Sequence, residues 1–353
     1  MDALIAATRE MVRVLKPSGS IFVNLGDKYV ADNRGSGVDA KRGAAKWAPA
    51  GPAGYPGEGV WQRKSLMLLP ERYRIRAVDE LGLIARAVVI WSKPNGLPES
   101  VTDRVRRSHE DWVHLTKQPR YFSAVDEIRE PHKSEPGREG KGALGGQKSL
   151  RPVGPNSGSY NTLGALPGSV WTIPTEPLRV PDHLGIDHFA AFPTEWPRRI
   201  IQGWSPREVC TACGEGRRPV VASARCVDGI PRQDLGARKV GGYQTEPSGI
   251  GNWRVTTERA LTGYACACPD TSAPTTPGVV LDPFGGTGTT ALVADVLGRH
   301  GITVDLSQDY CRLAEWRTSD PKQRAKAARR EYREPTQQID GQDVLFPDME
   351  VGV

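Results

Sequence analysis

The most constraining feature of this 353-residue chain is a short apolar run at 279–281 that ends on Asp282. A glycine- and threonine-rich turn follows at 283–290, and apolar residues then resume at helical spacing. This pattern predicts a buried strand, a tight turn and a helix N-terminus, where glycines admit a ligand close to free backbone N–H groups. A second apolar run at 301–304 ends on Asp305, where dinucleotide-type folds place the carboxylate that binds ribose hydroxyls. The segment therefore predicts a nucleoside-binding βαβ unit.

Strands and helices alternate through the remainder of the chain. Helices are predicted at 3–15 and 66–81, and strands at 20–25, 84–91 and 111–116. This alternation predicts an α/β fold with a mixed, mostly parallel sheet that carries helices on both faces. The position of the glycine turn close to the C-terminus is unusual, since such folds generally begin with it.

Composition limits the class of protein. Lys and Arg number 47 against 41 Asp and Glu, and this mildly basic balance is compatible with a nucleic-acid partner. The sequence has no apolar run of membrane length and no basic-then-apolar leader, so we expect a cytoplasmic protein without a membrane partner. In that compartment six cysteines favour a metal site or free thiols over disulfides.

The glycine turn itself distinguishes between cofactor classes. It lacks both the G-x-G-x-x-G of nicotinamide sites and the Gly-Lys-Ser/Thr of P-loops. Its letters, Asp-Pro-Phe-x-Gly-x-Gly-Thr-Thr from Asp282, resemble instead the S-adenosylmethionine loop of amino-group DNA methyltransferases. Segments 13–27, 89–117 and 188–193 also resemble that family, and in the order of its β-class, in which the catalytic half precedes the cofactor half.

This resemblance implies a fold, an activity and partners. The fold is a Rossmann-like methyltransferase with circularly permuted motifs, and the activity is methyl transfer from S-adenosylmethionine to adenine N6 or cytosine N4 of double-stranded DNA, as in restriction–modification systems. Both target bases stay open. The residues that the resemblance assigns to the cofactor are Asp282, Phe284, Gly286, Gly288, Thr289, Asp305, Phe192 and Pro193. The alternative for Phe192 is an ordinary core aromatic.

One family motif is missing from the sequence. The catalytic tetrapeptide of the family contains a Pro-Pro pair, which occurs nowhere in the 353 residues, so the catalytic residues are unknown. Its strand would lie between the strands at 279–281 and 20–25, and its loss leaves unpaired backbone groups there. We expect a truncated or split enzyme whose missing motif comes from upstream residues or from a complementing polypeptide. The alternatives are a catalytically silent DNA- or cofactor-binding subunit that needs a partner chain, a decayed remnant of such an enzyme, and a methyltransferase that acts on RNA or protein.

Four cysteines form two close pairs, Cys210 with Cys213 and Cys266 with Cys268. Four thiolates suit a closed, tetrahedral structural zinc site and predict a zinc-ribbon-like insert, although the C-x-C spacing is tighter than usual. The alternative is reduced, unliganded cysteine. Arginines between the two pairs favour contact with DNA, with solvated surface as the alternative.

The motifs and the composition divide the chain into six segments. These are a catalytic-side half at 1–128, a basic loop at 129–168 in the place of the target-recognition segment, a cofactor-packing segment at 169–206, the cysteine insert at 207–270, the S-adenosylmethionine-binding half at 271–318, and a basic helix and tail at 319–353.

Overall fold

The computed structural model describes most of the chain, and the statements below concern that part. The described residues are 1–30, 62, 64–96, 98–133, 161–186, 191–228, 254–270 and 272–332. Most of the predicted basic loop, the centre of the cysteine insert and the tail beyond 332 lie outside them.

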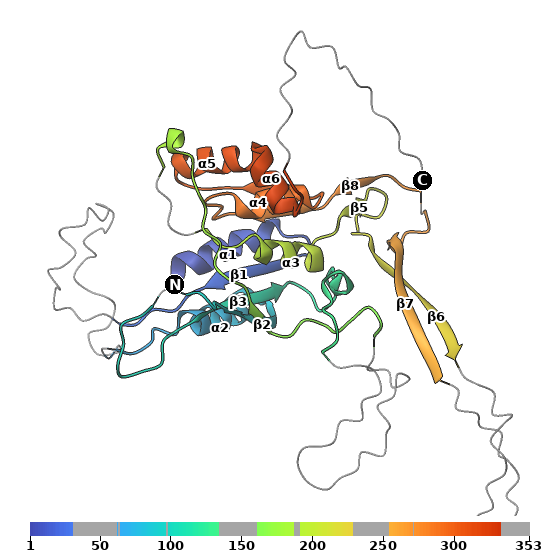
Figure 1. The fold of residues 1–353 in the computed structure, drawn as a ribbon, viewed down its shortest axis with the longest axis horizontal. Coiled ribbons are helices and arrows are strands. Elements are labelled where there is room, and N and C mark those ends of the chain that lie inside the picture. Colours follow the sequence, from blue (N-terminus) through green and yellow to red (C-terminus); the bar gives the residue numbers. More distant parts are fainter. Residues whose placement is uncertain are drawn as a thin grey trace, which may run out of the picture.

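The larger sheet has four strands in the order β1-β3-β2-β4 (Figure 1). They are β1 (Ser20–Leu25), β2 (Ile84–Ser92), β3 (His109–Thr116) and β4 (Val170–Thr172). β3 runs antiparallel to β1 and to β2, whereas β4 runs parallel to β2. Val113 lies opposite Val23 on one side and Val88 on the other, which places β3 in the middle of the sheet.

Helices α1 (Asp2–Val14) and α2 (Leu69–Leu81) pack on one face of this sheet. Because side chains alternate along a strand, Val113 and Leu115 share that face, and they form one buried cluster with Ile5 and Tyr73. Inside it, the Thr8 hydroxyl hydrogen-bonds the Tyr73 hydroxyl at 3.0 Å, so both buried polar groups are satisfied.

The opposite face of the sheet carries an aromatic cluster beneath α3 (Glu195–Trp204). The ring of Trp196 stacks on Trp112 at 4.8 Å and on Trp171 at 4.9 Å. The Trp91 indole N–H donates to the carbonyl oxygen of Ile173 at 2.7 Å. The described residues of the segment 169–206 thus pack on this face of the sheet.

A second, two-stranded sheet is built from the C-terminal part of the chain. Strands β9 (Val279–Asp282) and β10 (His300–Thr303) pair in parallel and are joined by α4 (Thr289–Val296). Helices α5 (Gln308–Ser319) and α6 (Pro321–Ala328) follow. The predicted strand–turn–helix–strand unit around the glycine turn is therefore confirmed.

The prediction of a mixed sheet is also confirmed, but parallel pairs do not dominate it. In the described residues β2/β4 and β9/β10 are parallel, while β3 is antiparallel to both of its neighbours. Alternation of elements along the sequence does not reveal that β3 is inserted between β1 and β2 against their direction. Within the described chain β9 pairs only with β10 and β1 only with β3, which leaves one edge of each strand without a partner strand.

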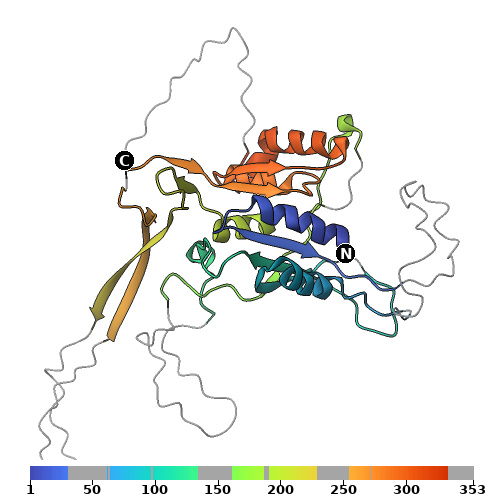
Figure 2. The same cartoon turned by 180° about the vertical axis from the view of Figure 1, so that it is seen from behind.

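The cysteine insert begins and ends beside a short sheet and contains a long ribbon. β5 (Glu208–Cys210) pairs with β8 (Thr275–Pro277), and β6 (Arg218–Asp228) pairs with β7 (Arg254–Ala265), both antiparallel. Figures 1 and 2 show the β6–β7 ribbon leading away from the four-stranded sheet and from the β9–β10 sheet. The described chain also contains the short 3₁₀ helices η2 (Val125–Ile128) and η3 (Asp182–Leu184). Among the described residues no helix has the length and apolar character that crossing a bilayer requires.

Candidate functional site

The two predicted carboxylates lie at the same edge of the β9–β10 sheet. Asp282 ends β9 opposite Thr303, and Asp305 follows β10 two residues later. The Asp282 carboxylate accepts from the backbone N–H of Phe284 at 3.1 Å and from the Thr290 hydroxyl at 2.6 Å. Parallel strands bring their carboxyl ends together, so this convergence follows from the βαβ connection.

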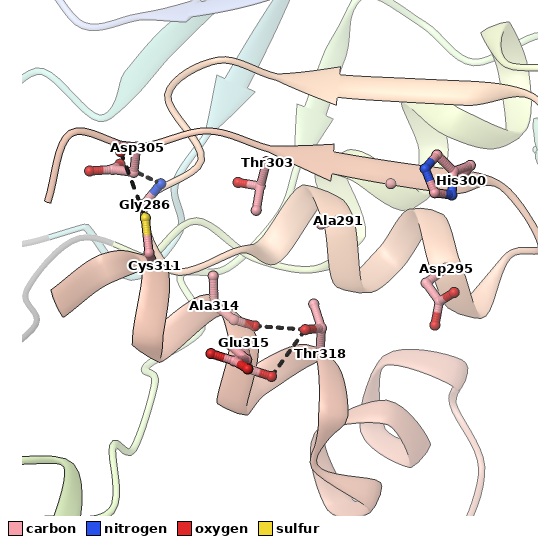
Figure 3. Close-up of a pocket in the computed structure, with 11 residues that line it drawn as sticks. Gly286, Ala291, Asp295, His300, Thr303, Asp305, Cys311, Ala314, Glu315 and Thr318 are labelled. Carbon is pink, nitrogen blue, oxygen red and sulfur yellow. Dashed lines mark hydrogen bonds between the residues drawn. The ribbon is translucent and has the colours of Figure 1, made fainter. Parts of the chain in front are cut away.

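Asp305 reaches across to the glycine turn. Its carboxylate accepts from the backbone N–H of Gly286 at 2.8 Å (Figure 3). It also accepts from the backbone N–H of Ser307 at 2.8 Å. Asp305 is thus hydrogen-bonded directly to the glycine turn, while Asp282 lies at the same edge with partners of its own. That these residues bind a common ligand stays a prediction.

The glycines of the turn serve different purposes. Gly286 and Gly288 have φ values of +49° and +71°, a region that disfavours side chains. A Cβ on Gly286 would meet nothing within 4 Å, so this residue faces open space. A Cβ on Gly288 would lie 2.7 Å from the Cβ of Ala314, so Gly288 permits close packing of the turn on α5.

A buried arginine beneath the turn was not predicted from the sequence. The Arg317 guanidinium of α5 donates to the Thr287 hydroxyl at 2.8 Å and to the Thr289 hydroxyl at 2.5 Å. All three residues are buried, and burial lowers the pKa of Arg317. The available signal was helical spacing, since Arg317 lies four residues after the buried Leu313. The Thr289 hydroxyl is thus turned toward Arg317 and supports the turn from below.

A cavity of about 490 Å³ opens beside the turn, between α4, β10 and α5 (Figure 3). Of the predicted cofactor residues, Gly286 and Asp305 line it. The rest of its lining consists of Ala291, Asp295, His300, Gly301, Thr303, Cys311, Ala314, Glu315 and Thr318. Asp282, Phe284 and Gly288 are not part of this lining, so the cavity overlaps the predicted site only at Gly286 and Asp305.

Apolar side chains project on the open side of the turn. Phe284 is 62% exposed and Leu306, directly after Asp305, is fully exposed. Large apolar residues that remain exposed beside polar acceptors are typical of a surface that binds a ligand. Leu306 was missed in the sequence because a single leucine after a strand carries no pattern of its own.

Phe192 and Pro193 lie just before α3, and Phe192 packs against the aromatic cluster. The Phe192 ring meets Trp112 edge-to-face at 6.1 Å, and Pro193 is buried. These are the contacts of a core aromatic, and an approach of Phe192 to a cofactor stays a prediction. Two residues later in the chain, Thr194 donates through its N–H and its hydroxyl to Glu176, each at 2.9 Å. His188 and Phe189 of the same motif lie outside the described residues.

Ion pairs hold the C-terminal basic helix against the rest of the protein. Lys326 pairs with Glu176 at 2.7 Å, Arg324 pairs with Asp295, and Arg329 pairs with Glu195. All three belong to the basic helix and tail that the sequence predicts at 319–353. Since each has an acidic partner within the fold, they are poorly placed to bind phosphate.

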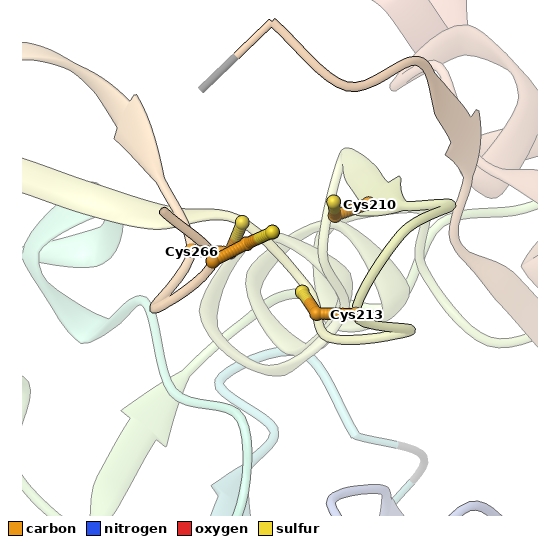
Figure 4. Close-up of side chains that lie close together, drawn as sticks. Cys210, Cys213 and Cys266 are labelled. Carbon is orange, nitrogen blue, oxygen red and sulfur yellow. The ribbon is translucent and has the colours of Figure 1, made fainter. Parts of the chain in front are cut away.

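The four predicted zinc ligands come together in one place. The Sγ atoms of Cys210, Cys213, Cys266 and Cys268 all lie within 4.8 Å of one another (Figure 4). None of them is in a disulfide. Cys210 ends β5, and Cys266 directly follows β7, so the cluster joins two separate strands of the insert.

Comparison with known proteins identifies the family. A sequence model of N6/N4-type DNA methylases matches residues 2–210 and 272–316. The chain belongs to this DNA methylase family. The match contains the larger sheet, the aromatic cluster and the glycine turn, and it passes over residues 211–271, which hold the β6–β7 ribbon.

Individual relatives of the chain are named as type II methyltransferases. The chain is 32% identical to M.Cfr9I of Citrobacter freundii over 201 residues, which are 57% of this chain and 55% of that protein. It is 26% identical to M.SmaI of Serratia marcescens over 317 residues, 89% of this chain and 72% of the relative. The chain thus spans about half the length of M.Cfr9I. Among solved structures, PvuII DNA methyltransferase, described as cytosine-N4-specific, aligns with a TM-score of 0.48 at 15% identity, over 93% of this chain and 75% of that one.

Proposed function

We propose that this DNA methylase transfers a methyl group from S-adenosylmethionine to an exocyclic amine of double-stranded DNA, either adenine N6 or cytosine N4. One observation carries the proposal: in a chain of this family, Asp282 and Asp305 flank an open glycine turn at the carboxyl edge of two parallel strands. Ligands bind at this edge in open α/β sheets. The names of the relatives, which are type II methyltransferases, favour the same activity.

The residues at the turn fit the proposed cofactor. An ionised carboxylate offers about four acceptor sites, and the hydrogen bonds above use two of those of Asp305, which leaves capacity for ribose hydroxyls. Gly286 faces open space, and the exposed Phe284 and Leu306 offer apolar surface to an adenine ring. The two carboxylates also provide negative charge for a cationic ligand.

The cofactor supplies an electrophilic methyl group on a sulfonium, and the protein must hold the acceptor amine in line with it. In this proposal Asp282, Phe284, Gly286 and Asp305 bind the cofactor, and Phe192 and Pro193 extend the apolar wall. Gly288, Thr289 and Arg317 act as positioning residues, because their contacts are with α5 or with each other.

We further propose that an additional strand supplies the oxygen atoms that accept hydrogen bonds from the target amine. The 353 residues contain no Pro-Pro pair, and in the described chain β1 and β9 each have one unpaired edge. On β9 the apolar side chains of Val279 and Leu281 are exposed. The unpaired edge of such a strand is a site where a further strand can pair. A complementing polypeptide or a further segment of the same protein would provide this strand. The same absence favours, as a second candidate, a subunit that binds DNA and cofactor without catalysing transfer.

Cofactor binding is tested by titration calorimetry with S-adenosylmethionine on the wild-type chain and two variants. Asp305→Ala removes the proposed ribose acceptor, and we expect at least a tenfold loss of affinity, about 1.4 kcal/mol. Asp309→Asn is the matched control, since this acidic residue of α5 is exposed and pairs with Arg312; its affinity should equal that of wild type. Equal affinities for all three proteins, or preferential binding of a nicotinamide dinucleotide, would contradict the proposal.

Transfer is tested with radiolabelled S-adenosylmethionine and double-stranded DNA, with and without a co-expressed segment that carries the family tetrapeptide. Transfer that requires this segment supports the additional strand, and transfer by the 353 residues alone refutes it. Binding without transfer in either case favours the silent subunit. Nucleoside analysis of the methylated DNA then distinguishes N6-methyladenine from N4-methylcytosine.

A further inference from the structure

The cysteine insert has a feature that the methylase family does not account for. Three of the four clustered cysteines, Cys213, Cys266 and Cys268, lie in the stretch 211–271 that the family match passes over, and Cys210 is the last residue before it. The cluster is therefore separate from the cofactor turn and needs an explanation of its own.

The sulfur geometry matches a tetrahedral metal site. Thiolates at about 2.3 Å from a tetrahedral Zn²⁺ lie about 3.8 Å from each other, and the four Sγ atoms here are all within 4.8 Å of one another (Figure 4). None forms a disulfide, which would require sulfurs about 2 Å apart. Four thiolates would complete the coordination sphere, and such closed sites are structural.

The backbone around the first pair has the form of a metal-binding knuckle. After Cys210 the chain turns through Gly214, whose φ is +73°, and the Gly214 N–H donates to the Cys210 carbonyl at 2.9 Å. This tight turn holds Cys210 and Cys213 in one short loop, as a C-x-x-C metal-binding pair requires.

The β6–β7 ribbon is the element that needs this support. Val220 and Leu261 are each 41% exposed and Tyr264 is 37% exposed, so large apolar side chains of the ribbon are only partly covered. A two-stranded ribbon without a packed face is marginally stable in water. Cys266 directly follows β7 and Cys268 comes two residues later, whereas Cys210 ends β5 of the β5–β8 sheet and Cys213 lies in the turn after it.

We propose that Cys210, Cys213, Cys266 and Cys268 bind one structural Zn²⁺. The metal would link the end of the β6–β7 ribbon at Ala265 to the β5–β8 sheet. The metal joins two stretches of chain that are more than fifty residues apart, so it closes a long loop and fixes the direction in which the ribbon leaves the protein. This role is independent of methyl transfer, because every ligand position is filled by protein and none is left for a substrate.

Metal content of the purified, reduced full-length chain gives the first test. We expect one Zn²⁺ per chain by elemental analysis, with a loss of more than half in Cys213→Ser and in Cys266→Ser. Cys311→Ser is the matched control, because this free, exposed thiol of α5 lies outside the cluster, and its metal content should equal that of wild type. Protein that stays metal-free after incubation with Zn²⁺, or that keeps full metal content in both cluster variants, overturns the proposal.

A second measurement on the unmodified chain covers the case in which the variants fail to fold. Replacement of the metal by Co²⁺ should give the intense visible bands of tetrahedral thiolate coordination. Removal of the metal with a chelator should raise amide hydrogen exchange in β6 and β7 by tenfold or more and leave exchange in β3 unchanged. Absence of the Co²⁺ bands, or unchanged exchange in the ribbon, contradicts the proposed site. Cofactor affinity, measured separately, reports on the methylase proposal alone.

Discussion

Gly288 provides the sharpest test of how the glycine turn is built. Alanine at this position would keep a φ of +71°, which costs about 1–2 kcal/mol for a residue with a Cβ. The new Cβ would also lie 2.7 Å from the Cβ and 3.0 Å from the Cα of Ala314, and such overpacking costs about 1–3 kcal/mol. We therefore expect Gly288→Ala to lower the free energy of unfolding by about 2–5 kcal/mol.

Gly286→Ala is the matched control for backbone strain without the clash. Its φ is +49°, but the added Cβ meets nothing within 4 Å, so only the conformational cost of about 1–2 kcal/mol applies. Because that Cβ projects into the proposed cofactor space, Gly286→Ala should weaken S-adenosylmethionine binding at least tenfold. Urea titrations followed by tryptophan fluorescence give the stabilities, compared at unchanged m-value.

The packing argument is isolated by a double-mutant cycle with Ala314→Gly. Removal of the Ala314 Cβ should recover about 1 kcal/mol or more of the loss in Gly288→Ala, beyond its own cost as a helix glycine. Equal destabilisation by Gly288→Ala and Gly286→Ala, together with a coupling energy of zero, would refute the assignment of Gly288 to close packing on α5.

Three further predictions concern the supports of the fold. Burial lowers the pKa of His114 to about 4. When the pH falls below 6.5, the usual pKa of histidine, the unfolded chain therefore takes up a proton before the folded chain does, and wild type should lose about 2 kcal/mol of stability between pH 7 and pH 5. His114→Gln should lack this loss in urea titrations at the two pH values. Arg317→Met leaves the buried Thr287 and Thr289 hydroxyls without their shared donor and should cost about 1–3 kcal/mol in the same assay, whereas an unchanged midpoint would show that the hydroxyls need no donor. Asp27→Ala removes the carboxylate that accepts from the first N–H groups of α2 and should cost about 1 kcal/mol, with faster amide exchange in that helix; exchange equal to wild type would contradict the capping role.

Much of the fold near the site could be predicted because its signals are local. The run that ends on Asp282, the glycines behind it and the helical spacing from Ala291 are all contiguous, so strand, turn and helix follow from residues that are neighbours in sequence. The approach of two cysteine pairs that lie more than fifty residues apart was also predictable, because two close Cys pairs in one chain are typical of a shared metal site.

Other features depend on residues that meet only in the folded chain. The burial of Arg317 beneath the turn, the packing of Gly288 on Ala314 and the antiparallel insertion of β3 between β1 and β2 are long-range arrangements. No periodicity within one segment encodes them, because they are fixed by how separate elements share a core. The sequence alone thus determined which residues form the glycine turn and the thiol cluster, whereas the tertiary structure decided which residues of the turn face open space and which support it from beneath.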